Sequence, residues 1–258
     1  MTYLPFENLQ DGCAAIAGGS GGLGRDIVRK FASVGSNVAF SYLSREQPAK
    51  ELEQEIQATG QGALAARVDL TDPASIRSWM AGAREKFGKI HTLVYACGPT
   101  VVIGPIADLT PEQWAAAVNA DLNGFFNLCH VGIPYLRESR GSIVALSTAG
   151  IRRYPAMDIT SAGPKAGVEM LVNGITREEG RNGIRANCVA VGQIDAGQGR
   201  DHLHDPRFER LAERVVRNTP LRRMGQSEEI ANAVLFFASS MASFVSGESI
   251  CVDGGGHV

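Results

Sequence analysis

The sequence predicts one α/β domain over residues 1–258, built on a doubly wound parallel sheet of the Rossmann type with helices on both faces. Short apolar runs alternate with helical stretches along the whole chain, and each run is apolar throughout instead of alternating with polar residues. Strands of that kind belong to parallel sheets covered on both faces, and right-handed crossovers wind such sheets in two directions. With 258 residues, 44% of them hydrophobic, the chain can bury one sizeable core.

The first half of the chain supplies four expected strand–helix units. The strands are the short apolar runs "CAAIAGG" (13–19), "NVAFSYL" (37–43), "GALAARVDL" (62–70) and "TLVYACG" (92–98). Each is followed by a longer stretch that predicts a helix, at about 22–34, 47–58, 73–87 and 111–137.

The second half continues the alternation. The strand "GSIVALST" (141–148) precedes a helix that Thr160 or Ser161 can cap, with Pro164 in its first turn. Apolar residues recur there at helical spacing, at Val168, Leu171, Val172 and Ile175. The remaining expected elements are a strand at 183–191, helices at about 206–217 and 228–239, and a last strand at 248–255.

Composition excludes several classes of partner. A net charge of −2 and a pI of about 6.2 give no bulk attraction to nucleic acid or an anionic membrane. No apolar stretch approaches a membrane span, and no signal peptide is expected. Five scattered cysteines without metal or redox spacing favour reduced thiols and a cytoplasmic protein. His202 and His204 alternate without a third ligand, so no metal site is expected.

A glycine-rich turn follows the first strand in "AIAGGSGGLGRDI". Gly18, Gly22 and Gly24 lie between that strand and the first helix. Glycines allow a tight turn and a close approach of the backbone to a pyrophosphate, and the helix N-terminus supplies N–H donors. This position indicates a nucleotide-binding turn.

The spacing Gly-x-x-x-Gly-x-Gly resembles that of the short-chain dehydrogenase/reductase family. The resemblance covers nearly the whole chain, through the segments "VDLTD" (68–72), "LVYACG" (93–98), "DLNGFF" (121–126), "SIVALST" (142–148), "IRANCVAVGQI" (184–194), "TPLRRMGQSEEIANAVLFFAS" and "VSGESICVDGGG". It implies the family's fold, an oxidoreductase activity and a nicotinamide cofactor.

The resemblance also implies which residues bind the cofactor. An acid at the end of the second strand would bind a ribose hydroxyl and repel a 2′-phosphate, but that position reads Ser41. Ser44 and Arg45 can bind a phosphate there, which favours NADP(H) over NAD(H). The implied cofactor residues are Gly18, Ser20, Gly22, Leu23, Gly24, Ser44, Arg45, Asp69, Leu70, Ala96, Gly98, Lys165, Gly192 and Ile194.

The catalytic positions depart from the family pattern. The family uses a serine, a tyrosine and a lysine, often with an asparagine; the tyrosine is the general acid/base, and the lysine lowers its pKa and holds the nicotinamide ribose. Here the lysine is Lys165, but the tyrosine position reads Ser161, the serine position Thr148 and the asparagine position Asp121. An aliphatic hydroxyl is a far weaker acid than a phenol, so Ser161 cannot simply replace the tyrosine.

Three hypotheses follow for the activity. The first is a reductase of a carbonyl or conjugated C=C bond with a relocated acid, for which Tyr154 is the first candidate. Asp158 is the second, at the position where some enoyl-thioester reductases of the family carry their tyrosine, provided that burial raises its pKa. "SAGPKAGVEM" also looks similar to the family's dienoyl-thioester reductases, which carry Ser-x-x-x-Lys. The others are a non-redox lyase or isomerase and a cofactor-binding protein without turnover.

Substrate and assembly are inferred from the resemblance. The segment from about 193 to 218 lies where the family places its substrate lid, and its arginines indicate a small polar or anionic substrate. Family members commonly form tetramers, so a homotetramer or homodimer is expected.

Overall fold

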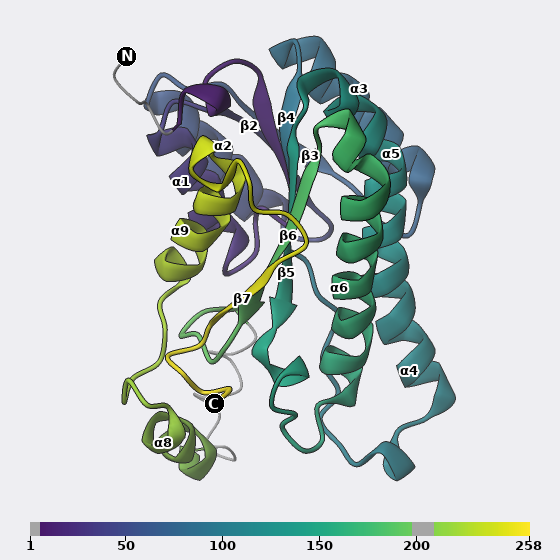
Figure 1. Cartoon of the computed structure of the whole chain (residues 1–258), viewed down its shortest axis with the longest axis vertical. Coiled ribbons are helices and arrows are strands. Elements are labelled where there is room, and N and C mark those ends of the chain that lie inside the picture. The colour runs from purple at the N-terminus through teal and green to yellow at the C-terminus, as the bar shows by residue number, and fades with distance from the viewer. Residues whose placement is uncertain (1–5, 198–208) are drawn as a thin grey trace.

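The computed structural model describes residues 6–197 and 209–258 and is centred on a seven-stranded, all-parallel sheet (Figure 1). The strand order is β3-β2-β1-β4-β5-β6-β7. The strands are β1 (Cys13–Ala17), β2 (Asn37–Tyr42), β3 (Ala63–Arg67), β4 (Ile90–Tyr95), β5 (Ser142–Thr148), β6 (Arg185–Val191) and β7 (Ser249–Val252). The predicted doubly wound, Rossmann-type sheet is confirmed.

Helices cover both faces of this sheet (Figure 1). One face carries α1 (Gly24–Ser33), α2 (Glu46–Ala58) and α9 (Ser227–Ala238). The other carries α3 (Pro73–Phe87), α4 (Pro111–Val118), α5 (Gly124–Ser139) and α6 (Ile159–Glu179). The helix α8 (Glu209–Asn218) lies at the end of the molecule toward which the strands point. None of the helices in the described ranges is long and apolar enough to cross a membrane.

Each face of the sheet has its own hydrophobic cluster. Along β1, Ala14 and Ile16 pack with α1, α2 and α9, whereas Cys13, Ala15 and Ala17 pack with α3, α5 and α6. This period-two division requires strands that are apolar on both sides, which is the pattern seen in the sequence.

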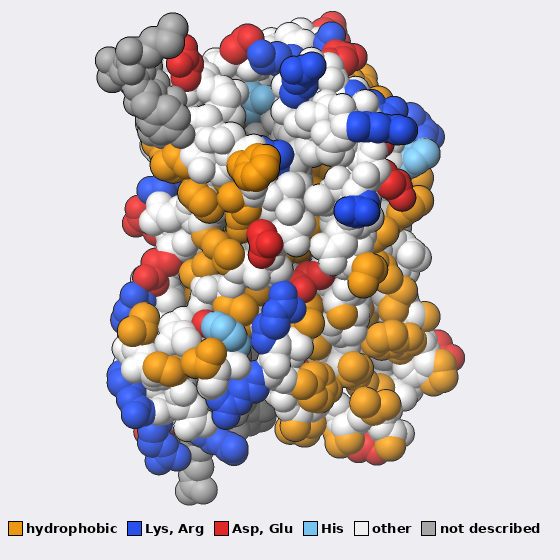
Figure 2. All heavy atoms as spheres, in the orientation of Figure 1, with side chains coloured by type: hydrophobic (Ala, Val, Ile, Leu, Met, Phe, Trp, Pro, Cys, Tyr) orange, Lys and Arg blue, Asp and Glu red, His pale blue; other side chains and the backbone are white. Residues whose placement is uncertain are grey.

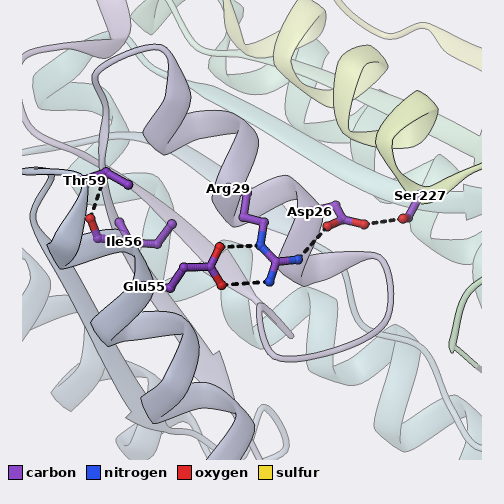
Figure 3. Close-up of polar contacts among 6 residues, drawn as sticks. All are labelled: Asp26, Arg29, Glu55, Ile56, Thr59 and Ser227. Carbon is purple, nitrogen blue, oxygen red and sulfur yellow. Dashed lines mark hydrogen bonds and ion pairs between the residues drawn. The ribbon is translucent and has the colours of Figure 1, made fainter.

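A polar network ties three helices together on the first face (Figure 3). Arg29 on α1 makes two hydrogen bonds of 2.8 Å to the carboxylate of Glu55 on α2 and one of 2.9 Å to Asp26. Asp26 in turn accepts a hydrogen bond from Ser227 at the start of α9. The network fixes the first turn of α1, the helix that begins at the glycine turn.

Two expected helices differ from those observed. The expected helix at 111–137 is interrupted by a π-helical turn at Asn119–Asn123, which separates α4 from α5. The helix α6 begins at Ile159 and not at Thr160 or Ser161, so Pro164 lies beyond the first turn. The start of the expected helix at 206–217 falls outside the described residues.

A buried histidine near the start of β4, His91, gives a test of the fold. His91 places Nε2 3.1 Å from the Ser36 hydroxyl and Nδ1 3.0 Å from the Thr92 hydroxyl. Burial, followed by the nearby Lys89, lowers the pKa of His91 to about 4. Between about pH 6.5 and pH 4, His91 is protonated in the unfolded chain but neutral in the folded chain. The free energy of unfolding therefore falls as the pH falls through this range.

We therefore expect wild-type protein to lose about 3 kcal/mol more unfolding free energy than His91→Gln between pH 7 and pH 4. Denaturant unfolding of both proteins across this range measures the difference. Identical pH dependence in the two would contradict a buried neutral His91.

Candidate functional site

The predicted nucleotide turn lies where β1 meets α1 and leaves no room for side chains. Gly18 has φ +78°, and a Cβ on it would lie 2.7 Å from Sγ of Cys97. A Cβ on Gly24 would lie 2.1 Å from the carbonyl oxygen of Gly18. The backbone of Gly197 crosses the same turn, because a Cβ on Gly22 would lie 2.5 Å from its Cα. Glycine is therefore required at several points of this cradle.

The first turn of α1 faces the cradle without a side-chain cap. Leu23 occupies the N-cap position, and its side chain has no oxygen to accept from the first amides of the helix. Ser20 is buried in the turn before it. Uncapped N–H groups and the positive end of the helix dipole bind anions. The arrangement suits a pyrophosphate.

The end of β2 carries the residues expected to select the cofactor. Ser41 is buried, and its hydroxyl accepts a 3.0 Å hydrogen bond from the Gly18 amide. Ser44 and Arg45 are exposed after the strand. Arg67, at the end of neighbouring β3, donates from Nε to the Leu43 carbonyl oxygen at 3.1 Å. Sequence reasoning missed Arg67 because the pairing of β2 with β3 cannot be read from composition.

The end of β3 holds the predicted adenine contact. Asp69 Oδ1 accepts hydrogen bonds from the amide and hydroxyl of Thr71, at 2.8 and 2.7 Å. These bonds lower the pKa of Asp69, so its carboxylate stays ionised. Leu70 follows it and is buried.

The predicted cofactor residues at the ends of β4 and β6 reach the same edge of the sheet. The Ala96 amide donates to the Ala17 carbonyl oxygen at 3.0 Å, and Gly98 has open space where a Cβ would lie. A Cβ on Gly192 would lie 2.5 Å from the Asp253 Cα, and the buried Ile194 forms a bridge with Gly225.

Lys165 is buried in a charged cluster behind this edge. Its ammonium group donates to Asp121 Oδ1 at 2.9 Å and to the Cys97 carbonyl oxygen at 2.8 Å. The Tyr95 hydroxyl lies 2.7 Å from the same Oδ1 and 2.9 Å from the Asp121 carbonyl oxygen. The ammonium also lies 4.7 Å from the centre of the Tyr95 ring, at cation–π distance. Two of the predicted catalytic residues, Lys165 and Asp121, are thus in direct contact.

This cluster is almost completely removed from solvent. Lys165 is 6% exposed and Asp121 is 0% exposed, on the π-helical turn between α4 and α5. Asp121 Oδ2 is buried and has no hydrogen-bond partner in the described part of the chain. Burial, and then the Asp121 charge, raise the pKa of Tyr95 well above its usual value, so its phenol stays protonated. Burial likewise raises the pKa of Cys97 to about 12, which leaves an unreactive thiol.

Thr148, Ser161 and Asp158 lie at the mouth of the site, between the end of β5 and the start of α6. The Thr148 hydroxyl accepts a 3.1 Å hydrogen bond from the Gly150 amide. Asp158 and Ser161 are partly buried at the beginning of α6. Asp158 is thus a second acid near the positions expected to be catalytic, besides the fully buried Asp121.

Tyr154 is set apart from these groups. It is 48% exposed in the segment between β5 and α6. No hydrogen bond fixes its phenol among residues 6–197 and 209–258.

A group of possible metal ligands lies at the C-terminal end, where the sequence showed no clustering of His257. Cys251, Asp253 and His257 each bring one ligand atom within 4.8 Å of the others. Both Asp253 oxygens already accept hydrogen bonds, from the Gly255 amide at 3.0 Å and from His257 Nδ1 at 2.8 Å. Hydrogen bonding therefore accounts for this group. His202 and His204 lie outside the described residues.

Comparisons with known proteins agree with this architecture. A family model described as enoyl-(acyl carrier protein) reductase matches residues 17–257. The 7alpha-hydroxysteroid dehydrogenase of Escherichia coli (strain K12) is 32% identical over 256 residues, covering 97% of this chain and 96% of that protein.

Solved structures give the same result. A short-chain dehydrogenase/reductase from Serratia marcescens BCRC 10948 superposes with a TM-score of 0.89 at 25% identity, covering 98% of this chain and 100% of that chain. A blue fluorescent protein from a metagenomic library, in complex with NADPH, superposes with a TM-score of 0.88 at 29% identity, with 98% and 100% coverage. By its fold and by these matches over nearly its full length, this chain belongs to the short-chain dehydrogenase/reductase family of oxidoreductases.

Proposed function

We propose that this chain is an NADP(H)-dependent oxidoreductase whose proton-donating group is not the family's tyrosine. The observation that carries the proposal is the glycine turn, in which a Cβ on Gly18, Gly22 or Gly24 would clash with other protein atoms, directly before the start of α1, which has no side-chain cap. A nucleotide pyrophosphate explains both features together. The NADPH in the metagenomic relative supports the same class of cofactor.

The residues at this edge fit the cofactor. Gly18, Gly22 and Gly24 would hold the pyrophosphate, Asp69 the adenine, and Lys165 the nicotinamide ribose. When bound, the cofactor supplies a hydride. An ammonium group has three N–H donors, and Asp121 and the Cys97 carbonyl take two of those of Lys165, which leaves one for a ribose hydroxyl.

The preference for NADP(H) rests on charge at the ends of β2 and β3. The end of β2 carries Ser41, whose hydroxyl accepts a hydrogen bond from the Gly18 amide, in place of an acid that would repel a 2′-phosphate. Arg45 follows β2, and Arg67 is tied to the same segment through the Leu43 carbonyl. Two guanidinium groups beside one strand end suit a phosphate, which guanidinium binds with paired hydrogen bonds.

We expect Arg45→Ala and Arg67→Ala each to weaken NADPH binding about tenfold while leaving NADH binding unchanged, since each removes one charge-assisted hydrogen bond of about 1.5 kcal/mol. Nicotinamide fluorescence titrations with both cofactors measure the two affinities. Arg77→Ala, which removes an exposed arginine from α3, is the matched control. Equal losses for NADPH and NADH would contradict the phosphate role, and no binding of either cofactor by wild-type protein would overturn the proposed function.

The catalytic part of the proposal concerns the mouth of the site. Thr148, Ser161 and Tyr154 would contact a carbonyl or conjugated C=C substrate, while Lys165 and Asp121 would act from behind. Tyr154 is exposed toward solvent, so it would have to move onto the substrate to donate a proton.

A second function is favoured by the same buried cluster. The ammonium of Lys165 is turned toward Asp121 and Cys97, and an aliphatic hydroxyl stands at Ser161, which suits a non-redox enzyme or a cofactor-binding protein without turnover. NADPH that binds but is never oxidised in the presence of carbonyl or enoyl compounds would favour this second function.

The surface supports a substrate with both a charged and an apolar part. Figure 2 shows Lys and Arg side chains gathered over α8 and hydrophobic side chains gathered on the opposite side of the same end. The exposed apolar residues around α4 and just before α6 include Ile103, Ile106, Trp114 and Met157. We propose a small polar or anionic substrate, a homotetramer or homodimer as the assembly, and a cytoplasmic location, which the five free cysteines support.

A further inference from the structure

Asp158 stands at the N-cap of α6 but does not cap the helix. An aspartate at this position ordinarily accepts a hydrogen bond from the second or third backbone amide of the helix. The side chain of Asp158 makes no such bond. Its carboxyl group is instead turned toward Gly150, with Oδ2 3.6 Å from the position that a Cβ on that glycine would occupy.

The same point brings Asp158 close to Thr148. Thr148 Oγ1 lies 3.2 Å from the position of that Cβ and Pro155 Cδ lies 3.1 Å from it, so Thr148, Pro155 and Asp158 all border Gly150 just after β5. Asp158, Ser161 and Lys165 are spaced three and four residues apart and share one face of α6. The carboxyl group thus ends a polar stripe that runs from the buried ammonium to the mouth of the site.

The charged groups around Asp158 are directed elsewhere. Arg152 is bonded to Glu169, Arg153 to the carbonyl oxygens of Gly256 and Val258, and Lys165 to Asp121. Burial raises the pKa of Asp158 to about 6, and the hydrogen bond from Ser161 opposes this only in part. About half of the Asp158 carboxyl groups are therefore protonated near pH 6, and about a tenth at pH 7.

We propose that Asp158 is the general acid of this site, in the role that the missing tyrosine fills elsewhere in the family. The inference rests on the proposed reductase function. In the reduction the substrate carbon accepts a hydride from NADPH, and Asp158 gives its proton to the substrate oxygen, or to the enolate that forms from a conjugated C=C bond. Asp158, which is only partly buried, becomes a carboxylate and recovers a proton from water.

Neither tyrosine near the site suits this role as well. The Tyr95 phenol lies beside Lys165 but is 0% exposed, so no substrate can reach it. Tyr154 is exposed and lacks a partner in the described ranges that would hold it over the site. Asp158 is both partly buried and close to Thr148.

The test combines binding, turnover and a direct titration. Wild-type, Asp158→Asn, Ser161→Ala and Tyr154→Phe proteins are titrated with NADPH and assayed with ethyl acetoacetate and crotonyl-CoA between pH 5 and 8. Glu85→Gln, which changes an exposed carboxylate on α3, is the matched control. The Asp158 carboxyl is titrated by NMR in aspartate-labelled protein, with Asp158→Asn identifying its signal.

We expect Asp158→Asn to bind NADPH normally and to lower kcat about 100-fold or more, the usual contribution of a general acid. The wild-type rate should fall as the pH rises through about 6. Ser161→Ala should move this fall in rate to higher pH, because it removes a hydrogen bond that stabilises the ionised Asp158 carboxylate and so raises the pKa of Asp158. If Asp158 had only a structural role, Ser161→Ala would not shift the pH profile.

Other outcomes overturn the inference. An Asp158 signal that titrates near its ordinary value of about 3.9 would do so, and so would Asp158→Asn turning over within threefold of wild type. Loss of turnover in Tyr154→Phe alone would move the acid to Tyr154. Wild-type protein that oxidises no NADPH with either probe would overturn the inference together with the proposed function, whereas the preceding outcomes leave that function standing.

Discussion

Replacing Asp121 by alanine is expected to lower the free energy of unfolding by about 3–5 kcal/mol, the usual cost of breaking a buried ion pair. The substitution leaves Lys165, which is 6% exposed in the wild-type protein, without its carboxylate partner. It also removes the acceptor that Tyr95 contacts at 2.7 Å. Guanidinium denaturation at pH 7 gives the change in unfolding free energy.

Two further variants separate the buried charge from general disruption. Asp121→Ala combined with Lys165→Met removes both charges and should recover much of the lost stability, since an uncompensated ammonium is the main cost. Glu46→Ala breaks the exposed pair with Lys50, whose side chains are each 57% exposed, and should cost less than about 1 kcal/mol. If Asp121→Ala costs no more than Glu46→Ala, the cluster does not hold a buried ion pair.

The sheet was predictable because its strands carry a signal that does not depend on their neighbours. β1 is apolar on both sides, and its residues divide between two clusters on opposite faces. Such a strand has no stable place except between two layers of helices. The glycine turn was predictable for a similar reason, since backbone geometry at Gly18 and Gly24 restricts those positions to glycine alone.

The hydrophobic periodicity of residues 111–137 does not indicate the interruption of the expected helix. A π-helical turn adds one residue to a helix without requiring glycine or proline, and here it places Asp121 against Lys165 and Tyr95. The start of α6 was misplaced for a different reason. Thr160 and Ser161 are good caps locally, but the chain begins the helix at Ile159, and the carboxyl group of Asp158 does not cap it.

The partners of the predicted site residues depend on tertiary contacts. Tyr95 belongs to the apolar run of an expected strand, and nothing local links it to Asp121, 26 residues away. Arg67 was not predicted because its hydrogen bond to the Leu43 carbonyl oxygen depends on the pairing of β2 with β3. The sequence therefore predicted the nucleotide turn better than the groups around Lys165.

Gly24→Ala is expected to weaken NADPH binding at least about 100-fold, the loss of two charge-assisted hydrogen bonds of about 1.5 kcal/mol each. The new Cβ would lie 2.1 Å from the Gly18 carbonyl oxygen and 2.9 Å from the Gly19 Cα. Both contacts are with backbone atoms, so no side-chain rotation can relieve them. The start of α1 must move away from the turn, and its amides then miss the pyrophosphate.

Gly82→Ala provides the matched control, because a Cβ at this position in α3 meets nothing within 4 Å. That variant should gain about 0.5–1 kcal/mol in stability, the usual benefit of alanine over glycine inside a helix, and bind NADPH as wild type does. Calorimetric titration gives the affinities, and thermal melting shows whether Gly24→Ala is still folded. A folded Gly24→Ala protein with wild-type affinity would mean that the cofactor does not lie against the β1–α1 turn.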